Sequence, residues 1–197
     1  MSSKLSHTLS KVVLGCLALY FIYLISNVIS IVNRRYINTS DGTYINNTRE
    51  NQELFQLANR LTKHCNTKEC QVQSILYYVT NIPYKINNFT AHSPQQTIQK
   101  NFGDCDDKSN LLISLLHELN IESYFVLVPQ HIFVIVALPQ IKHKKALYVN
   151  NRPFYILEST AKNSPIGFPL HYSLDDIKAI IEPFENRKID IKTIEYK

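Results

Sequence analysis

An uncharged stretch near the N-terminus is the feature that most constrains the fold of this chain. From Val12 to Val32 the sequence carries no charge, and one glycine, two serines and one asparagine are the interruptions among apolar and aromatic residues. As a helix with a rise of about 1.5 Å per residue, this stretch is about 31 Å long and matches the roughly 30 Å hydrocarbon core of a bilayer. It predicts a transmembrane helix over residues 12–32, after an N-terminal tail over residues 1–11.

A cleaved secretory signal is the alternative for the same stretch. Lys4 and Lys11 would form its basic start, and Val28-Ile29-Ser30 is a weak cleavage site. The apolar run exceeds the roughly 7–15 residues of a signal core, and Arg34 and Arg35 resemble a stop-transfer flank, so we favour an uncleaved single-pass anchor. Because basic residues flank both ends, charge leaves the orientation open; we expect the domain that follows to lie outside the cytoplasm.

Composition indicates that the remainder of the chain folds. Of the 197 residues, 45% are hydrophobic and 11% are aromatic, which excludes a disordered chain and allows a core. The formal net charge of +5 is spread along the sequence, so nothing in it indicates binding to nucleic acid. Residues 33–50 are polar and aperiodic and predict a linker, and residues 51–197 are predicted to form one domain.

Hydrophobic periodicity predicts helices in the first half of this domain and mostly strands in the second. Apolar residues spaced by three and four positions indicate helices, and β-branched or aromatic runs between turn residues indicate strands. The predicted helices cover residues 51–63, 69–80, 94–99, 105–119 and 173–181. The predicted strands cover residues 123–128, 132–138 and 154–157, with a final edge strand at 189–192. Helices followed by a mostly antiparallel sheet make an α+β fold.

The candidate chemistry lies at Cys105, in the first turn of the leucine-rich helix predicted over 105–119. A helix N-terminus carries about half a positive charge and unpaired N–H groups, so it stabilises a thiolate and can receive an oxyanion. Asp104 is placed to cap this helix, and Asp106 and Asp107 follow the cysteine. Because these carboxylates oppose thiolate formation, the cysteine needs a cationic partner.

His131 and Glu158 are the predicted partners of this cysteine. His131 heads one predicted strand, and Glu158 directly follows the end of the next. If these two strands are neighbours and antiparallel, the start of one lies beside the end of the other, and the two side chains can meet. Cysteine, histidine and carboxylate would then act as nucleophile, base and orienting group.

In this order and setting, the residues resemble the transglutaminase-like superfamily, a circularly rearranged relative of the papain-type cysteine proteases. The resemblance covers roughly residues 50–165 and is most specific at Gly103–Asp107. It also includes the Ser93-Pro94 helix start, the strand that begins at His131 and the sequence Leu157-Glu-Ser-Thr.

The resemblance implies a papain-like core and a catalytic triad on Cys105, His131 and the position of Glu158. The family usually has Asp-Pro-Thr at the third position, whereas this chain has Glu-Ser-Thr. The implied activity is acyl transfer through a thioester, with a protein or peptide as substrate: amide or peptide hydrolysis, or transamidation onto an amine. The calcium sites of the animal enzymes lie outside the matched region, and no metal or cofactor is expected.

Other interpretations of the same residues lead to a different function class. A capped helix start can simply hold a buried cysteine, and a lone histidine on a strand is commonly structural. A lapsed member of such a family would bind peptide or scaffold a complex without catalysis. A cation site at Asp104, Asp106 and Asp107 is disfavoured, because consecutive helical positions do not converge on one ion.

A second pair of cysteines predicts a disulfide. Cys65 and Cys70 flank a predicted helix-to-helix turn, where chain reversal can bring their Cβ atoms within the roughly 3.5–4.5 Å that a disulfide requires. With His64 they superficially resemble a metal cluster, but the second pair of ligands is missing. A disulfide persists outside the cytoplasm, in agreement with the expected location of the domain.

Overall fold

The computed structural model describes residues 2–33, 36–39, 42–87 and 91–197, and it divides the chain into two units, Met1–Tyr36 and Ile37–Lys197. The first unit consists chiefly of helix α1 (Ser2–Asn33). Within α1, the stretch Leu9–Ile29 is long and apolar enough to cross a membrane, and none of it is buried against protein. Length and composition alone decide this, and a signal sequence near the N-terminus has the same properties. Arg34 and Arg35, which we interpret as a stop-transfer flank, lie outside the described residues.

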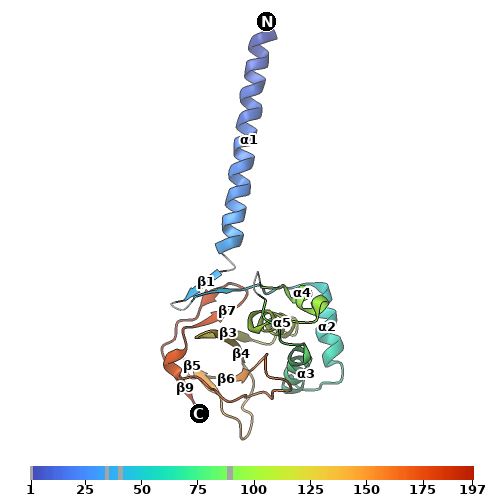
Figure 1. Ribbon diagram of the computed structural model, residues 1–197, viewed down its shortest axis with the longest axis vertical. Helices are drawn as coiled ribbons and strands as arrows, with labels where there is room; N and C mark the ends of the chain where they lie inside the picture. The colour runs from blue at the N-terminus through green and yellow to red at the C-terminus, as the bar shows by residue number, and fades with distance from the viewer. Residues whose placement is uncertain (1, 34–35, 40–41, 88–90) are drawn as a thin grey trace. The chain divides into compact units, whose positions relative to one another are not determined.

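The second unit is built around a seven-stranded sheet in the order β8-β7-β3-β4-β6-β5-β9 (Figure 1). Every neighbouring pair in it is antiparallel. Its strands are β3 (Ser123–Val128), β4 (His131–Val136), β5 (Leu147–Val149), β6 (Arg152–Leu157), β7 (Ala179–Glu182), β8 (Arg187–Lys188) and β9 (Ile194–Tyr196). A separate two-stranded sheet pairs β1 (Tyr36–Thr39) with β2 (Gly42–Ile45).

Four helices precede the large sheet, and α5 is central among them. They are α2 (Gln52–Thr62), α3 (Lys68–Asn81), α4 (Pro94–Lys100) and α5 (Cys105–His117). Each begins at a side chain that accepts a hydrogen bond from a backbone N–H of the first turn, supplied by Asn51, Thr67, Ser93 and Asp104. Helix α5 packs on β3 and β4 and also contacts α2, α3 and α4 (Figure 1).

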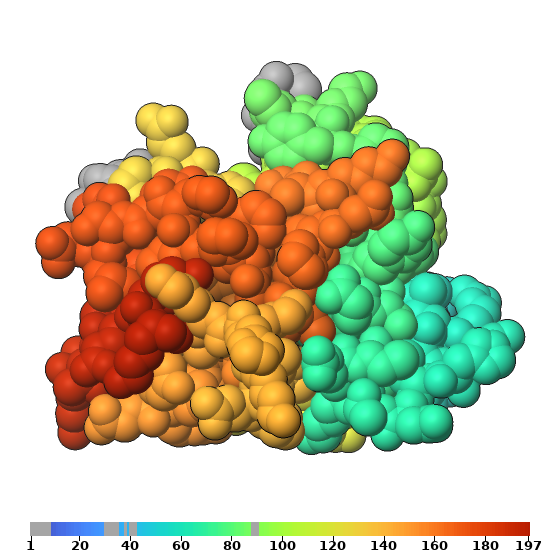
Figure 2. All heavy atoms as spheres, turned by 90° about the horizontal axis from the view of Figure 1, so that it is seen from below, coloured from blue at the N-terminus to red at the C-terminus, as the bar shows by residue number. Residues whose placement is uncertain are grey.

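The sheet is buried on both faces, because apolar residues of its central strands alternate between two cores. Phe125 and Leu127 of β3 join the core beneath the helices, whereas Val126 and Val128 join a second core. Residues of the C-terminal part of the chain cover that second core. Figure 2 shows these C-terminal residues in orange and red beside the helical residues in cyan and green. The unit is therefore layered, with the sheet between the helices and the C-terminal segment.

This architecture confirms the predicted α+β class. The four helices of the second unit agree with their predicted ranges to within two residues at each end. The three predicted central strands are present as β3, β4 and β6, and β4 and β6 are antiparallel neighbours, as the argument for His131 and Glu158 requires.

The helix predicted over 173–181 is wrong. Ser173 does form a capping box, but it opens a single 3-10 turn, Leu174–Asp176. The apolar residues after it form strand β7, which pairs with β3 through Phe125↔Ile181. The run Ala179–Glu182 is too short for its hydrophobic period to distinguish a helix from a strand. It forms a strand because it pairs with the edge of β3.

Two other stretches differ from the prediction. The linker predicted over 33–50 contains β1 and β2, and Asn46 and Asn47 at its end are buried. The Asn47 backbone N–H donates to Asn110 Oδ1 of α5, so a long-range hydrogen bond compensates for burying these polar residues. The edge strand predicted at 189–192 is also wrong: strands occur at Arg187–Lys188 and Ile194–Tyr196, and the alternating isoleucines at 189 and 191 instead pack against the second core.

Candidate active site

The candidate nucleophile, Cys105, is the first residue of helix α5. The Asp104 side chain caps this helix: its Oδ1 accepts a hydrogen bond from the Asp107 N–H at 3.2 Å, and its Oδ2 accepts one from the Asn87 N–H at 3.1 Å. Asp104 therefore ties the helix start to the segment that contains Asn87. This cap does not use the N–H groups of Cys105 and Asp106, which belong to the first turn of the helix.

The approach to this helix start requires a glycine at position 103. A Cβ on Gly103 would lie 2.6 Å from the Asp107 Cβ, closer than real Cβ contacts allow. Gly103 also forms a parallel bridge with Tyr84, in which its N–H donates to Pro83 O and its carbonyl accepts from the Lys85 N–H. The missing side chain lets this segment lie against the start of α5.

His131 and Glu158 are brought together by the pairing of β4 with β6. His131 Nε2 lies 2.9 Å from Glu158 Oε2, and the two side chains are 18% and 11% exposed. Glu158 Oε1 accepts hydrogen bonds from the Thr160 N–H and hydroxyl. Burial opposes ionisation of Glu158, but His131 and the hydrogen bonds from Thr160 outweigh it and lower the pKa of Glu158. The carboxylate is thus held in its charged form against the imidazole.

Cys105 and His131 line one cavity of about 270 Å³. Its wall consists of residues from β1 and β2, the start of α5 and the turn from β3 to β4. Glu158 contacts the imidazole of His131 but does not itself line the cavity. Two of the three residues singled out in the sequence therefore face a common space, and the third is bound to one of them.

The Cys105 thiol is neutral in this state. Burial, together with the carboxylates of Asp106 and Asp104, raises the pKa of the Cys105 thiol to about 12. The Asp106 backbone N–H acts in the opposite direction but is outweighed. The thiolate stabilisation expected from the helix N-terminus is therefore outweighed in the resting site by desolvation and by two adjacent carboxylates, whose opposing effect was expected from the sequence.

Asp106 is the acidic residue in direct contact with the thiol. The Cys105 Sγ donates to Asp106 Oδ1 at 3.6 Å. Burial and the neighbouring Asp104 carboxylate raise the pKa of Asp106 to about 7. Sequence reasoning recognised the acidic neighbours, but not that one of them accepts a hydrogen bond from the nucleophile.

Part of the sequence that builds this arrangement matches a known family. The profile of the Transglutaminase-like superfamily matches residues 56–132, a stretch that contains both Cys105 and His131. Residues 56–132 are therefore similar to the transglutaminase-like superfamily. Glu158 lies beyond the matched stretch, so its place in the site comes from the geometry alone.

Two solved structures share a likeness with this chain. A candidate cysteine protease from Cytophaga hutchinsonii is 18% identical over 74% of this chain and 50% of its own, with a TM-score of 0.43. A candidate protease from Parabacteroides distasonis is 14% identical over 71% of this chain and 27% of its own, with a TM-score of 0.46. This chain thus spans half the length of the first protein and less of the second. No curated protein matches the sequence.

Two tyrosines of the second unit belong to the site without having been singled out in the sequence. Tyr172, in the C-terminal segment, stacks on the His131 ring with centroids 6.1 Å apart. Tyr44, on β2, lines the cavity and donates from its hydroxyl to Asn110 Oδ1 at 3.4 Å. The sequence around each tyrosine has no hydrophobic periodicity or motif that would have indicated a place in the site.

Helix α5 also contributes a buried lysine beside the site. Lys108 is 1% exposed, and its Nζ donates to the carbonyls of Ile82 at 2.8 Å and Thr80 at 3.4 Å. Burial lowers the pKa of Lys108 to about 8, although the Glu158 charge acts to raise it. One turn from Cys105, Ser109 Oγ lies 3.1 Å from Ser159 Oγ, so the helix is tied directly to the end of β6.

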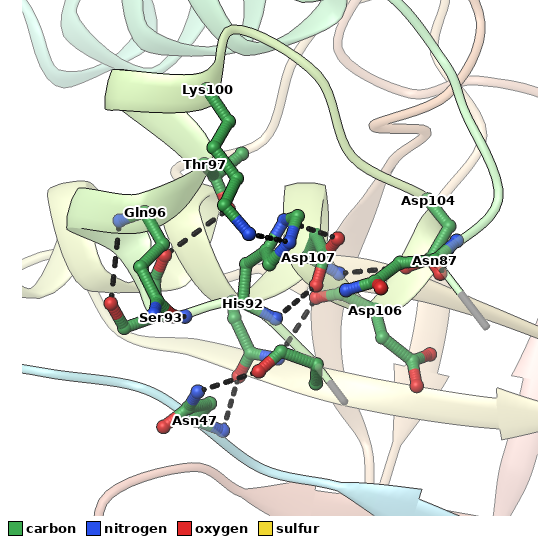
Figure 3. A network of polar contacts seen from close by, with 12 residues as sticks. Asn47, Asn87, His92, Ser93, Gln96, Thr97, Lys100, Asp104, Asp106 and Asp107 are labelled. Carbon is green, nitrogen blue, oxygen red and sulfur yellow. Dashed lines mark hydrogen bonds and ion pairs between the residues drawn. The ribbon is translucent and has the colours of Figure 1, made fainter. Parts of the chain in front are cut away.

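A buried polar network supports α5 from its other side (Figure 3). The wholly buried Asp107 pairs with His92, Nδ1 to Oδ2 at 3.0 Å, and also accepts the His92 backbone N–H. Lys100 Nζ lies 2.9 Å from His92 Nε2. In Figure 3 the Asp106 side chain points away from this network. Asp107 thus holds the segment that leads into α4, whereas Asp106 lines the cavity.

The remaining sequence candidates have structural roles. Cys65 and Cys70 are joined by a disulfide, with their Cα atoms 5.3 Å apart, so their sulfurs are not available to a metal. The three acidic residues at the start of α5 diverge, to the helix cap, the thiol and His92 respectively.

Proposed function

We propose that this chain is a membrane-tethered thiol acyl-transfer enzyme in which Cys105 is the nucleophile, His131 the base and Glu158 the orienting carboxylate. The observation that carries the proposal is the shared cavity of Cys105 and His131, with Glu158 bound to Nε2 of the imidazole. Because Nε2 is engaged, Nδ1 is the ring nitrogen left to exchange a proton with the thiol. Glu158 stabilises the imidazolium that this exchange creates.

The proposed reaction begins when His131 removes the Cys105 proton as the sulfur attacks an amide carbonyl carbon. The C–S bond forms, and the carbonyl electron pair moves to oxygen. When the tetrahedral species collapses, the C–N bond breaks, and the leaving amine takes the proton from His131. The product is a thioester on Cys105, and water or a primary amine then attacks it and restores the thiol. The N–H groups of Cys105 and Asp106 are placed to receive the oxyanion.

The tether is proposed from the apolar stretch of α1. We assign residues 1–11 to a tail, 12–32 to a single membrane span and the transglutaminase-like domain to the side opposite the tail. The Cys65–Cys70 disulfide supports a location of this domain outside the cytoplasm, where such bonds persist. Its substrate is then a protein or peptide accessible at that membrane surface.

One observation favours the alternative of a non-catalytic binding module. A thiol with a pKa of about 12 contributes almost no thiolate at neutral pH, and its neighbours increase that pKa. Because the resting Cys105 is a neutral thiol, a catalytic Cys105 has to transfer its proton to His131 during the reaction. A binding module needs no such step and would tolerate replacement of the cysteine.

The test is a product screen with the full-length chain in detergent. A mixed peptide library is incubated with wild type, Cys105→Ala and Cys105→Ser, with and without a biotinylated primary amine, and products are identified by mass spectrometry. The proposal expects new peptide termini, or amine incorporated into peptides, in wild type alone. Products that are equal in wild type and Cys105→Ala, or peptides bound by both without conversion, would support the binding module.

A further inference from the structure

The cavity at Cys105 has an uneven charge distribution. Its lining contains two carboxylates, Asp104 and Asp106, and among the described residues that line it there is no lysine or arginine. Asp104 is occupied with backbone N–H groups at the helix start. The chain as a whole carries a formal charge of +5, so the acidity of this space is a local property.

Asp106 is the carboxylate available to a ligand in this space. In the described part of the chain, its side chain is seen to contact the Cys105 thiol and forms no ion pair with a basic residue. Its neighbour Asp107, by contrast, faces His92 in the buried network of Figure 3, with Oδ2 3.0 Å from His92 Nδ1. Asp106 is therefore a partly buried acid without a counter-ion, next to the reacting sulfur.

We infer that Asp106 makes this site selective for substrates that place a cationic group, a lysine or arginine side chain or an amine, beside the reacting carbonyl. This inference rests on the proposed function and assigns its substrate class. A cation in the cavity supplies the counter-ion that Asp106 lacks, and a cleft with low-dielectric walls strengthens that attraction. An anionic group would meet two carboxylates and be excluded.

The same contact links recognition to reactivity. Asp106 is among the groups that raise the pKa of the Cys105 thiol, so a cation paired with Asp106 reduces the cost of ionising the sulfur. The other groups acting on Asp106 are Asp104 and Asp107 from its own helix start and His131 from β4, while Tyr44 from β2 and Tyr84 interact with it as neutral phenols. The hydrogen bond from Cys105 and the charge of His131 act to favour the charged form of Asp106.

The test uses small thiol reagents of opposite charge in place of the unidentified substrate. Full-length chain carrying Cys16→Ser, so that Cys105 is the free thiol, is treated with methanethiosulfonates bearing trimethylammonium or sulfonate. Labelling rates are measured by intact-mass spectrometry and divided by those of a free small thiol. Wild type should favour the cationic reagent, and Asp106→Asn should lower that cationic-to-anionic ratio about tenfold, the low end of charge focusing in clefts.

A matched control and a pH series make the result decisive. Asp190→Asn removes the same charge from an exposed site and should leave the ratio unchanged. In the chain with native Asp106, the ratio should fall as pH decreases through about 7, where Asp106 becomes protonated, and this measurement needs no variant that could misfold. An equal ratio in wild type and Asp106→Asn, or a ratio independent of pH, would overturn the inference.

The peptide screen separates this inference from the proposed function. Peptides converted by wild type should be enriched in lysine or arginine beside the processed residue, and Asp106→Asn should lower the ratio of converted cationic peptides to converted neutral peptides. Conversion without the enrichment refutes the charge selectivity and leaves the enzyme assignment standing. A charge-dependent labelling ratio without any Cys105-dependent conversion refutes the enzyme and leaves a cation-selective binding cavity.

Discussion

Replacing Glu158 by Gln tests the orienting role directly, because it removes one charge and changes little in shape. The Glu158 carboxylate lies 2.9 Å from His131 Nε2, and both side chains are largely buried. At an effective dielectric constant near 20, two unit charges about 4 Å apart interact by about 4 kcal/mol, an upper bound for stabilising the imidazolium. Glu158→Gln also replaces a hydrogen bond to a charged group by a neutral one. This gives a lower bound of about 1.5 kcal/mol for the lost stabilisation of the imidazolium.

These bounds convert to a rate loss between roughly tenfold and roughly 1000-fold, since each 1.36 kcal/mol is about a factor of ten. The assay follows single-turnover conversion of the peptide that wild type processes fastest in the screen. Thermal unfolding of each variant in detergent checks that the fold is retained. Glu158→Asp keeps the charge and should stay within about tenfold of wild type, which makes it the matched control.

One result would refute this reasoning. If Glu158→Gln converts the peptide at the wild-type rate while Cys105→Ala does not convert it, the chain works with a cysteine–histidine dyad. Glu158 would then be a carboxylate that stabilises the end of β6 through Thr160.

Three further predictions concern stability, each measured by urea unfolding of the full-length chain in detergent. Reducing the Cys65–Cys70 disulfide should cost about 2 kcal/mol, because a separation of five residues closes a short loop; no change on reduction would contradict this. Gly103→Ala should destabilise the chain by about 1–3 kcal/mol, since its Cβ meets Asp107, and Gly15→Ala, with open space around it, is the control. Lys108 has its pKa lowered from 10.5 to about 8, so between these values the unfolded chain binds a proton that the folded chain has lost. Stability contributed by this group therefore rises with pH over that window, and the difference between wild type and Lys108→Met should show it.

Local patterns identified the elements that hold the candidate site. The helix start at Cys105 follows from a capping aspartate, acidic residues in the first turn and a broad leucine stripe. The strands that carry His131 and Glu158 follow from continuous apolar runs bounded by turn residues. These signals are recognisable because each depends on residues within one or two turns of each other.

Contacts between segments that are distant in the sequence could not be predicted from such local patterns. Strand β7 formed where a short apolar run met the edge of β3, a pairing that no local rule predicts. Tyr172 reaches His131 from the C-terminal segment, and Ser159 meets Ser109 across the core. Such contacts depend on the sheet order and on the layer that covers its second face.

The sequence by itself determined the apolar helix, the order of helices before the large sheet and the identity of the three candidate catalytic residues. Only the tertiary structure decided the electrostatic state of the nucleophile. The helix dipole is a local property that favours a thiolate at Cys105, and the adjacent carboxylates seen in the sequence oppose it; burial adds to their effect, and the thiol pKa is raised to about 12. Burial is set by the packing of the whole domain, and a charge acts through space on whatever the fold places beside it. For that reason the sequence could place Cys105 at a helix start, whereas its protonation state required the assembled cavity.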